Sequence, residues 1–173
     1  MQLRHLFSSD TKGYIMPQQK GIKLIAENRK AYHDYFIEDR FECGIVLSGT
    51  EVKSIRLGKI NLRDSYCTVK EGEMWLIGVN ISPYEQGNRY NLDPMRSRKL
   101  LLHKSEIVKL FSKIKLDGLT LVPTKCYFKD GRVKIEIGLA RGKKNYDKRD
   151  VEARKQADKD AKAAVKASRK YDY

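Results

Sequence analysis

Apolar and polar residues alternate along several stretches of the chain, as half-buried β-strands require. One such stretch follows a turn signal at Glu71-Gly72 and predicts a hairpin of two strands between residues 65 and 81. A second pair, residues 119–128 and 132–140, is joined by Lys129-Asp130-Gly131, and Asp-Gly supplies the positive φ angles of a tight hairpin turn. The alternating apolar positions are Trp75, Ile77, Val79 and Ile81 in the first hairpin and Val133, Ile135, Ile137 and Leu139 in the second.

A further strand and two helices follow from the same kind of pattern. The stretch from about Tyr35 to Leu47 is rich in β-branched and aromatic residues, which predicts a long strand with a bend or bulge at Gly44. Residues 50–57 show near-helical spacing and predict a short helix with Thr50 as N-cap and Gly58 as its stop. A longer helix is predicted within residues 103–118, where the apolar positions i, i+3, i+4 and i+7 are Ile107, Leu110, Phe111 and Ile114.

These elements predict a mainly β fold with short helices. An OB-like closed antiparallel β-barrel suits a basic chain of this size, and an α+β sandwich is the alternative. We expect the barrel to span residues 22–139, after a flexible N-terminal extension at residues 1–21 that contains a possible internal start at Met16. The aromatic residues assigned to the core are Phe36, Phe41 and Trp75.

The C-terminal tail, residues 140–173, differs in composition from the rest of the chain. Its stretch 151–170 consists largely of Ala, Lys, Glu and Arg, which favour helix, with Val151 and Val165 as sizeable apolar residues. A helix without an apolar face is marginal in water. We therefore expect the tail to be disordered, or helical when a partner binds it, and an idle solubilising tail is the alternative for the last residues.

The charge of the chain points to a polyanionic partner. Lys and Arg number 36 against 22 Asp and Glu, which gives a formal net charge of +14. Twelve of the basic and six of the acidic residues lie in the tail, so the tail and the rest of the chain are both basic. Such an excess favours nucleic acid as the partner, and a merely soluble basic protein is the alternative.

The residues that could carry chemistry form no catalytic or metal-binding pattern. Cys43, Cys67 and Cys126 are widely spaced, and we expect reduced, buried thiols, with no metal and no cofactor. His33-Asp34 could belong to a metal-dependent nuclease, but the sequence has no H-x-H or H-E-x-x-H pattern. Because no nucleophile, acid and base stand out, we expect that the protein is not an enzyme. Because the sequence shows no secretory core and no membrane span, we expect it to be cytoplasmic.

Basic and aromatic residues are interleaved in two stretches, "NRKAYHDYF" at 28–36 and "NRYNLDPMRSRK" at 88–99. Lys and Arg neutralise phosphates, while Tyr and His offer planar faces on which unpaired bases stack. The second stretch lies in a connection, residues 82–99, that is too long to be routine and that we expect to be functional. Its interleaved residues are Tyr84, Arg89, Tyr90, Arg96, Arg98 and Lys99.

Four stretches, in order, resemble the bacterial SsrA-binding protein family, also called small protein B. "LSGTEVKSIRLGKINLRDSY" at 47–66 is similar to the family signature, chiefly at Gly49–Arg56. The other three are "NRKAYHDYFIEDRFECGI", "DPMRSRKLLLHKSEI" and "GLARGKKNYDKR", so the resemblance covers roughly residues 22–149. Beyond Arg149 the Ala/Lys-rich sequence lacks the Trp and bulky apolar residues of many relatives.

The resemblance implies an RNA-binding protein with an OB-like barrel that is not itself catalytic. Such a protein binds the tRNA-like domain of transfer-messenger RNA (tmRNA) and delivers it to stalled ribosomes for trans-translation, which releases the ribosome and tags the peptide. Its tail enters the empty decoding centre and mRNA path of the small subunit. Elongation factor Tu and alanyl-tRNA synthetase are implied as indirect partners through tmRNA. A general OB-type single-strand RNA-binding or ribosomal protein is the alternative.

The resemblance also implies which residues bind. The tmRNA-binding face carries over to Asn28, Arg29, Lys30, His33, Tyr35, Glu42, Leu101 and His103. The decoding-centre element carries over to Gly142, Lys143, Lys144, Tyr146, Asp147, Lys148 and Arg149, with Tyr146 able to stack on a ribosomal base. In an RNA interface Glu42 would accept hydrogen bonds from base edges or 2′-hydroxyls, or orient a basic neighbour, and a structural ion pair is the alternative.

Overall fold

The computed structural model describes residues 21–144, 149, 152–154 and 156–162. Residues 152–154 and 156–162 are helical. The elements before them are, in chain order, β1 (Ile22–Glu27), α1 (Arg29–Asp34), β2 (Tyr35–Ile45), α2 (Gly49–Arg56), β3 (Ile60–Asn61), β4 (Tyr66–Lys70), β5 (Glu73–Ile77), β6 (Asn80–Ile81), η1 (Glu85–Tyr90), β7 (Arg98–Leu101), α3 (Lys104–Asp117), β8 (Thr120–Lys129) and β9 (Arg132–Gly142).

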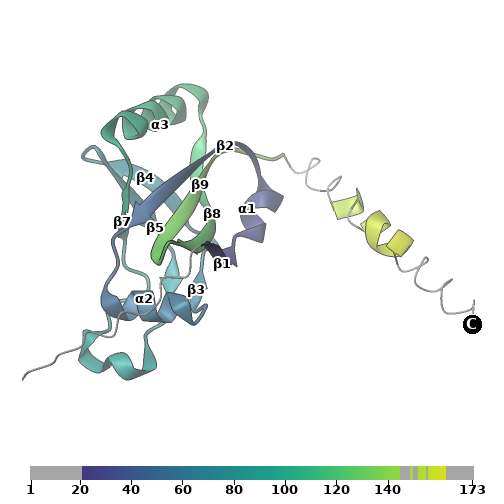
Figure 1. The fold of residues 1–173 in the computed structure, drawn as a ribbon. Coiled ribbons are helices and arrows are strands. Elements are labelled where there is room, and N and C mark those ends of the chain that lie inside the picture. Colours follow the sequence, from purple (N-terminus) through teal and green to yellow (C-terminus); the bar gives the residue numbers. More distant parts are fainter. Residues whose placement is uncertain (1–20, 145–148, 150–151, 155, 163–173) are drawn as a thin grey trace, which may run out of the picture.

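Six of the strands pair side by side into a ring. The order around it is β8-β4-β5-β7-β2-β9, and β9 pairs back with β8. Strand β1 adds to β8 from outside the ring, and β3 pairs with β6 in a small separate sheet. Helices α3 and α2 lie at opposite ends of the strands, and α1 lies to one side (Figure 1). The expected mainly β fold with short helices is confirmed.

The interior of the ring is a continuous apolar core. Many of its completely buried side chains come from strands β5, β8 and β9 and helix α2, and burying each stabilises the fold by about 2 kcal/mol. Both predicted hairpins are present, and Asp130 (φ 49°) with Gly131 (φ 75°) forms the turn between β8 and β9. The side chains with no exposed area include Ile55, Met74, Leu76, Leu121, Ile135, Ile137 and Leu139.

Two of the three aromatic core assignments are wrong. Met74 and Leu76 of β5 are completely buried, so the alternating Trp75 lies on the outer side of the ring, where it is half-buried opposite Thr68 and Lys99. The alternation that placed Trp75 with the buried Val79 breaks at Gly78, whose φ of +78° ends the strand between them. Phe36 is 49% exposed, whereas Phe41 packs against the core as expected.

The predicted helices exist, with a different start for α2. Its N-cap is Ser48 rather than Thr50, because Ser48 and Glu51 form a capping box. Ser48 Oγ accepts a hydrogen bond from the Glu51 backbone N–H, and the Glu51 carboxylate accepts one from the Ser48 backbone N–H. In α3, Ile107 and Leu110 are buried, and the helix ends at Gly118 in the left-handed conformation. Helix α1 and strand β1 were not among the predicted elements.

The last strand continues beyond the expected end of the folded part. Strand β9 runs past Leu139 to Gly142, and its final residues pair with the first residues of β2, Tyr35 with Gly142 and Phe36 with Arg141. The residues from Ala140 to Gly142 therefore belong to the sheet, and the tail leaves the ring only after them.

Candidate nucleic-acid interface

Strand β2 places Tyr35 and Glu42 on the same outer side of the ring. Tyr35 packs against a small outer cluster of Ala31, Val122 and Ala140, whereas Cys43 faces the core. An odd and an even position of one strand would normally point to opposite faces. The β2–β9 pairing shifts its register between Ile37 and Asp39, and this bulge brings Glu42 to the side of Tyr35.

Glu42 is held as a carboxylate among three donors. Tyr127 donates its hydroxyl to Glu42 Oε2 at 2.7 Å, and the ammonium groups of Lys129 and Lys134 lie 3.0 and 3.6 Å from the carboxylate. The hydrogen bond from Tyr127, followed by that from Lys129, lowers the pKa of Glu42 below its ordinary value. Burial is the larger cause of the raised pKa of Tyr127, and the hydrogen bond to Glu42 raises it further. Glu42 therefore orients two lysines on an outer surface.

Leu101 continues this surface across strand β7. It is 52% exposed and pairs with Gly44 of β2, where an added Cβ would come within 3.3 Å of the Leu101 Cβ. Both residues border a cavity of about 410 Å³, to which Lys134 also contributes. Lys134 thus connects Glu42 with Leu101. The remaining lining residues are Ile45, Leu47, Val52, Gly131, Arg132 and Val133.

Asn28 fixes helix α1 to the ring. Its side-chain amide donates to the carbonyls of Leu62 (2.9 Å) and Pro123 (3.0 Å), and its Oδ1 accepts from the Ala31 N–H (3.1 Å). Asn28 is buried, so its side chain positions α1 instead of reaching a ligand. The residues that it positions, Arg29 and Lys30, are exposed, and Lys30 pairs with Asp64.

The end of α1 also holds the start of the tail. Lys143 donates its backbone N–H to the Asp34 carbonyl and its ammonium to the Tyr32 carbonyl, both at 2.9 Å. The same ammonium lies 4.8 Å from the centroid of the exposed Phe36 ring. His33 lies between two carboxylates, with Nδ1 2.9 Å from Asp34 and Nε2 3.0 Å from Glu152. His33 and Lys143 therefore both contact residues at the end of α1.

The other expected residues are placed as follows. His103 is exposed just before α3, and its backbone N–H donates to Glu106 Oε2 at 3.0 Å, which caps that helix. Gly142 pairs with Tyr35, while Lys144 and Arg149 are exposed. Tyr146, Asp147 and Lys148 lie outside the described residues.

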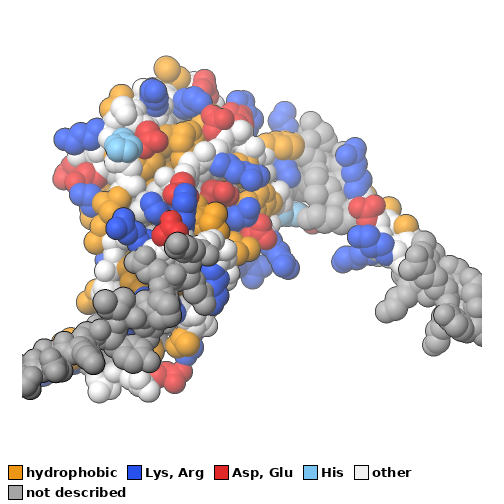
Figure 2. Space-filling view, viewed as in Figure 1, with side chains coloured by type: hydrophobic (Ala, Val, Ile, Leu, Met, Phe, Trp, Pro, Cys, Tyr) orange, Lys and Arg blue, Asp and Glu red, His pale blue; other side chains and the backbone are white. Residues whose placement is uncertain are grey.

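Sequence reasoning missed two residues of this surface, Arg40 and Lys134, and Arg40 joins it to α1. The Arg40 guanidinium lies 5.7 Å from the centroid of the Tyr32 ring, and Arg40 shares the outer side of β2 with Glu42. The sequence could have indicated Lys134, since it neighbours the predicted core residue Ile135 in an alternating strand and so had to lie on the outer side. Figure 2 shows basic side chains over much of this view, with acidic ones between them. We call Tyr35, Arg40, Glu42, Leu101 and Lys134 the β2 face.

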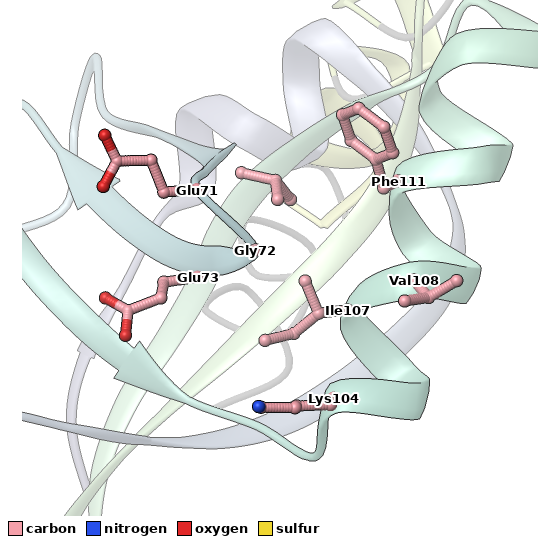
Figure 3. A pocket seen from close by; sticks show the side chains of 8 residues that line it. Glu71, Gly72, Glu73, Lys104, Ile107, Val108 and Phe111 are labelled. Carbon is pink, nitrogen blue, oxygen red and sulfur yellow. The ribbon is translucent and has the colours of Figure 1, made fainter.

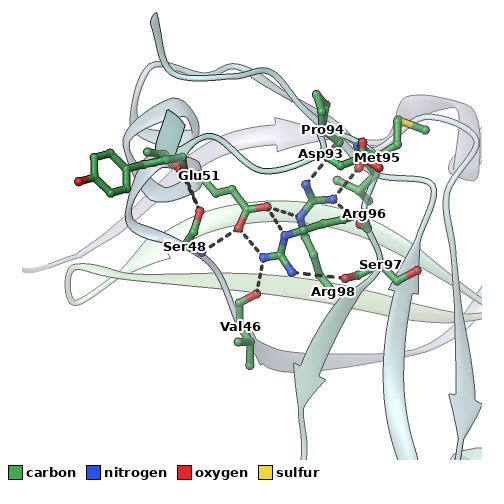
Figure 4. Close-up of polar contacts among 12 residues, drawn as sticks. Val46, Ser48, Glu51, Asp93, Pro94, Met95, Arg96, Ser97 and Arg98 are labelled. Carbon is green, nitrogen blue, oxygen red and sulfur yellow. Dashed lines mark hydrogen bonds and ion pairs between the residues drawn. The ribbon is translucent and has the colours of Figure 1, made fainter. Parts of the chain in front are cut away.

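A buried ion-pair network fixes the long connection before β7. Glu51 accepts from Arg98 Nε at 2.8 Å and from Arg96 Nη2 at 2.5 Å, and the Arg98 side chain is completely buried (Figure 4). Arg98 also donates to the carbonyls of Val79 and Pro94. Burial raises the pKa of Glu51, but the hydrogen bonds from Arg96, from the Ser48 N–H and from Arg98 outweigh it, so this pKa lies below its ordinary value. Arg96 and Arg98 are thus committed to the fold.

A second cavity, of about 430 Å³, lies between the β4–β5 turn and α3 (Figure 3). Apolar side chains of α3, Ile107, Val108 and Phe111, face the turn at Glu71-Gly72 across it. Lys104 and Glu73 border the opening, and Glu73 pairs with Lys99. Nothing in the described part of the chain covers this cavity.

The three cysteines are free and buried, as the sequence predicted. Burial raises the pKa of Cys43 and of Cys126 to about 12, so these thiols stay protonated at neutral pH. Among the described residues, no three His, Cys, Asp or Glu side chains are placed to hold a metal ion. No helix in those ranges is long and apolar enough to span a membrane.

A ring of antiparallel strands that displays cations and aromatic rings on its outer side is typical of small β proteins that bind nucleic acids. The family model described as "SmpB protein" matches residues 25–167, and the chain belongs to that family. The SsrA-binding proteins of Desulfitobacterium hafniense (strain DSM 10664 / DCB-2) and Carboxydothermus hydrogenoformans are each 59% identical to it. Each alignment covers 84% of this chain, and the two alignments cover 91% and 97% of the respective relatives.

A solved structure described as "tmRNA-SmpB: a journey to the center of the bacterial ribosome" has the same fold. It matches with a TM-score of 0.60 at 51% sequence identity, and the match covers 69% of this chain and 85% of that one. The resemblance inferred from the four sequence stretches is therefore confirmed.

Proposed function

We propose that this protein binds the tRNA-like domain of tmRNA and delivers it to stalled ribosomes for trans-translation. The observation that carries the proposal is the agreement of sequence and fold with SsrA-binding proteins over most of the chain. The ring of strands is then an OB-like closed barrel, and the protein acts in the cytoplasm by binding rather than by catalysis. Elongation factor Tu and alanyl-tRNA synthetase act on the tmRNA that it carries.

The β2 face and helix α1 form the tmRNA-binding surface in this proposal. Lys129 and Lys134, held by Glu42, neutralise phosphates, while the side chain of Leu101 gives an apolar contact beside them. Arg29 and His33 extend the surface along α1, which Asn28 holds in place. The tail, starting at Gly142 and Lys143, enters the decoding centre and mRNA path, where rRNA phosphates offset its ordering cost.

The experiment compares affinities for the tmRNA tRNA-like domain and for an unrelated structured RNA of equal length, across a salt series. Lys134→Ala tests the β2 face, and Lys109→Ala on α3 is the control, because it removes the same charge from an exposed position elsewhere. We expect Lys134→Ala to weaken tRNA-like domain binding by about 1 kcal/mol, roughly fivefold, and to lower the salt slope by about one.

The wild type should also prefer the tRNA-like domain by a margin that persists at high salt, since only the electrostatic part of the affinity falls with salt. Equal affinities for both RNAs at every salt concentration would overturn the proposed function and favour a general RNA-binding protein. Equal effects of the two substitutions would overturn only the assignment of the β2 face.

A further inference from the structure

A second surface combines aromatic rings with cations, and it shares no residue with the β2 face. Helix α2 and the connection that contains η1 bring together Lys53, Lys59, Tyr84, Arg89 and Tyr90, which we call the α2–η1 surface. Tyr90 is 67% exposed, although a large aromatic ring gains from burial. Thr50 of α2 donates to the Tyr90 carbonyl at 3.2 Å, which joins the two elements.

Hydrogen bonds and close packing hold the connection that carries these rings. Asn91 closes it as a loop, because its side chain accepts from the Tyr84 N–H at 3.0 Å and donates to the Tyr84 carbonyl at 2.9 Å. Gly87 lies so close that an added Cβ would come within 2.5 Å of Asn91. The ion pairs of Glu51 hold the following residues. The backbone that carries the exposed Tyr90 and the partly buried Tyr84 is thus held before any ligand binds, which lowers the entropy cost of binding.

Each ring has a cation over one of its faces, which leaves the other face for a base. Lys53 Nζ lies 5.3 Å from the centroid of Tyr84, and the Arg89 guanidinium lies 5.2 Å from that of Tyr90. Within the described residues no carboxylate forms an ion pair with Lys53 or Arg89, whereas Lys59 is paired with the exposed Glu85. The surface therefore has two rings and two cations that are not neutralised by an acidic side chain of the described chain.

We propose that the α2–η1 surface is a binding site for a short unpaired RNA segment. Unpaired bases stack on exposed aromatic rings, and the phosphates between them pair with Lys and Arg, so such a site needs both kinds of side chain close together, as in the α2–η1 surface. A base-paired helix keeps its bases stacked on one another and gains nothing from the rings. An acidic protein partner would need only the cations and an apolar one only the rings, so the combination of both favours single-stranded RNA.

The test uses the full-length protein and a 4-thiouridine-labelled single-stranded RNA of about 12 nucleotides, with the duplex of the same sequence as a second probe. Photo-crosslinks located by mass spectrometry show where the single strand lies. Affinity is measured for Arg89→Ala/Tyr90→Ala and for Lys70→Ala/Tyr66→Ala, a control that removes one cation and one exposed tyrosine from β4. The melting temperature of each variant confirms that it folds.

We expect crosslinks within residues 83–91, and a loss of single-strand affinity of about fivefold or more in Arg89→Ala/Tyr90→Ala, since each stacked base contributes about 1 to 3 kcal/mol. Tyr90→Phe should keep most of the affinity, because the ring and not the hydroxyl stacks. Crosslinks confined to other surfaces would overturn the proposal. So would equal losses in the two double variants, tighter binding of the duplex, or unchanged affinity, the last being the result expected of a protein-docking surface.

Discussion

At the scale of single residues, Glu42 shows how a carboxylate can serve an RNA-binding surface. Its charge repels phosphate, yet it holds Lys129 and Lys134 and accepts from Tyr127. We expect Glu42→Gln to weaken binding of the tRNA-like domain by roughly 1 kcal/mol, about fivefold, because the loss of oriented lysines outweighs the loss of repulsion. Affinity titrations at constant salt measure this effect, and tighter binding would show that the carboxylate acts only by repulsion.

The same residue predicts a pH dependence of stability. The pKa of Glu42 is lowered in the folded state, so its contribution is complete above the ordinary glutamate pKa and is lost as pH falls through the folded value. The wild type should therefore unfold at a higher temperature than Glu42→Gln at pH 7. The difference should disappear well below the ordinary pKa of 4.5, as thermal unfolding at a series of pH values measures. A difference that is constant with pH would contradict this linkage.

Sequence reasoning could place Glu42 in an interface only by resemblance. The strand that contains it was predicted, but the bulge between Ile37 and Asp39 decides that Glu42 and Tyr35 share a side, and a bulge leaves no regular pattern. Gly78 likewise interrupts a regular alternation: it ends β5, so that Val79 is buried whereas Trp75 lies on the outer side. Local periodicity gave the strands, whereas the direction of individual side chains depended on interruptions in them.

At the scale of elements, the pair of Glu51 on α2 and Arg98 on β7 joins parts that the sequence shows only as separate motifs. Removing the charge of Glu51 leaves the completely buried Arg98 guanidinium without a counter-ion. We expect Glu51→Gln to lower the free energy of unfolding by about 3 kcal/mol. Glu73→Gln is the control, because its pair with Lys99 is partly exposed and should contribute less than about 1 kcal/mol.

Urea unfolding at pH 7 measures both variants, and equal losses would show that the Glu51 network does not hold the fold. The sequence signature gave no sign that Arg96 and Arg98 would serve this network, because burial depends on the packing of α2 over the strand ends. Helix α1 was missed for a similar reason. Its cap, Asn28, is recognisable, but the two carbonyls that it bonds belong to Leu62 and Pro123, far away in sequence.

At the scale of the whole molecule, a folded ring and a charged tail meet at β9, and composition alone locates that boundary too early. The change to a coreless sequence suggested Leu139, but β9 pairs with β2 as far as Gly142, and Lys143 is bonded to Asp34 and Tyr32. Truncation after Lys144 should therefore keep the fold and, at high salt, the affinity for the tRNA-like domain, while abolishing peptide tagging on stalled ribosomes.

Truncation after Leu139 is the informative comparison, because it also removes the strand residues opposite Tyr35 and Phe36 and should lower the unfolding temperature. Tagging assays with purified ribosomes, beside the same binding titrations, separate the two functions of the chain. At low salt the protein truncated after Leu139 should bind RNA more weakly than the full chain, since residues 140–173 carry twelve of the 36 basic residues against six of the 22 acidic ones. Full tagging by the protein truncated after Lys144 would show that the ring, and not the tail, recognises the vacant decoding centre.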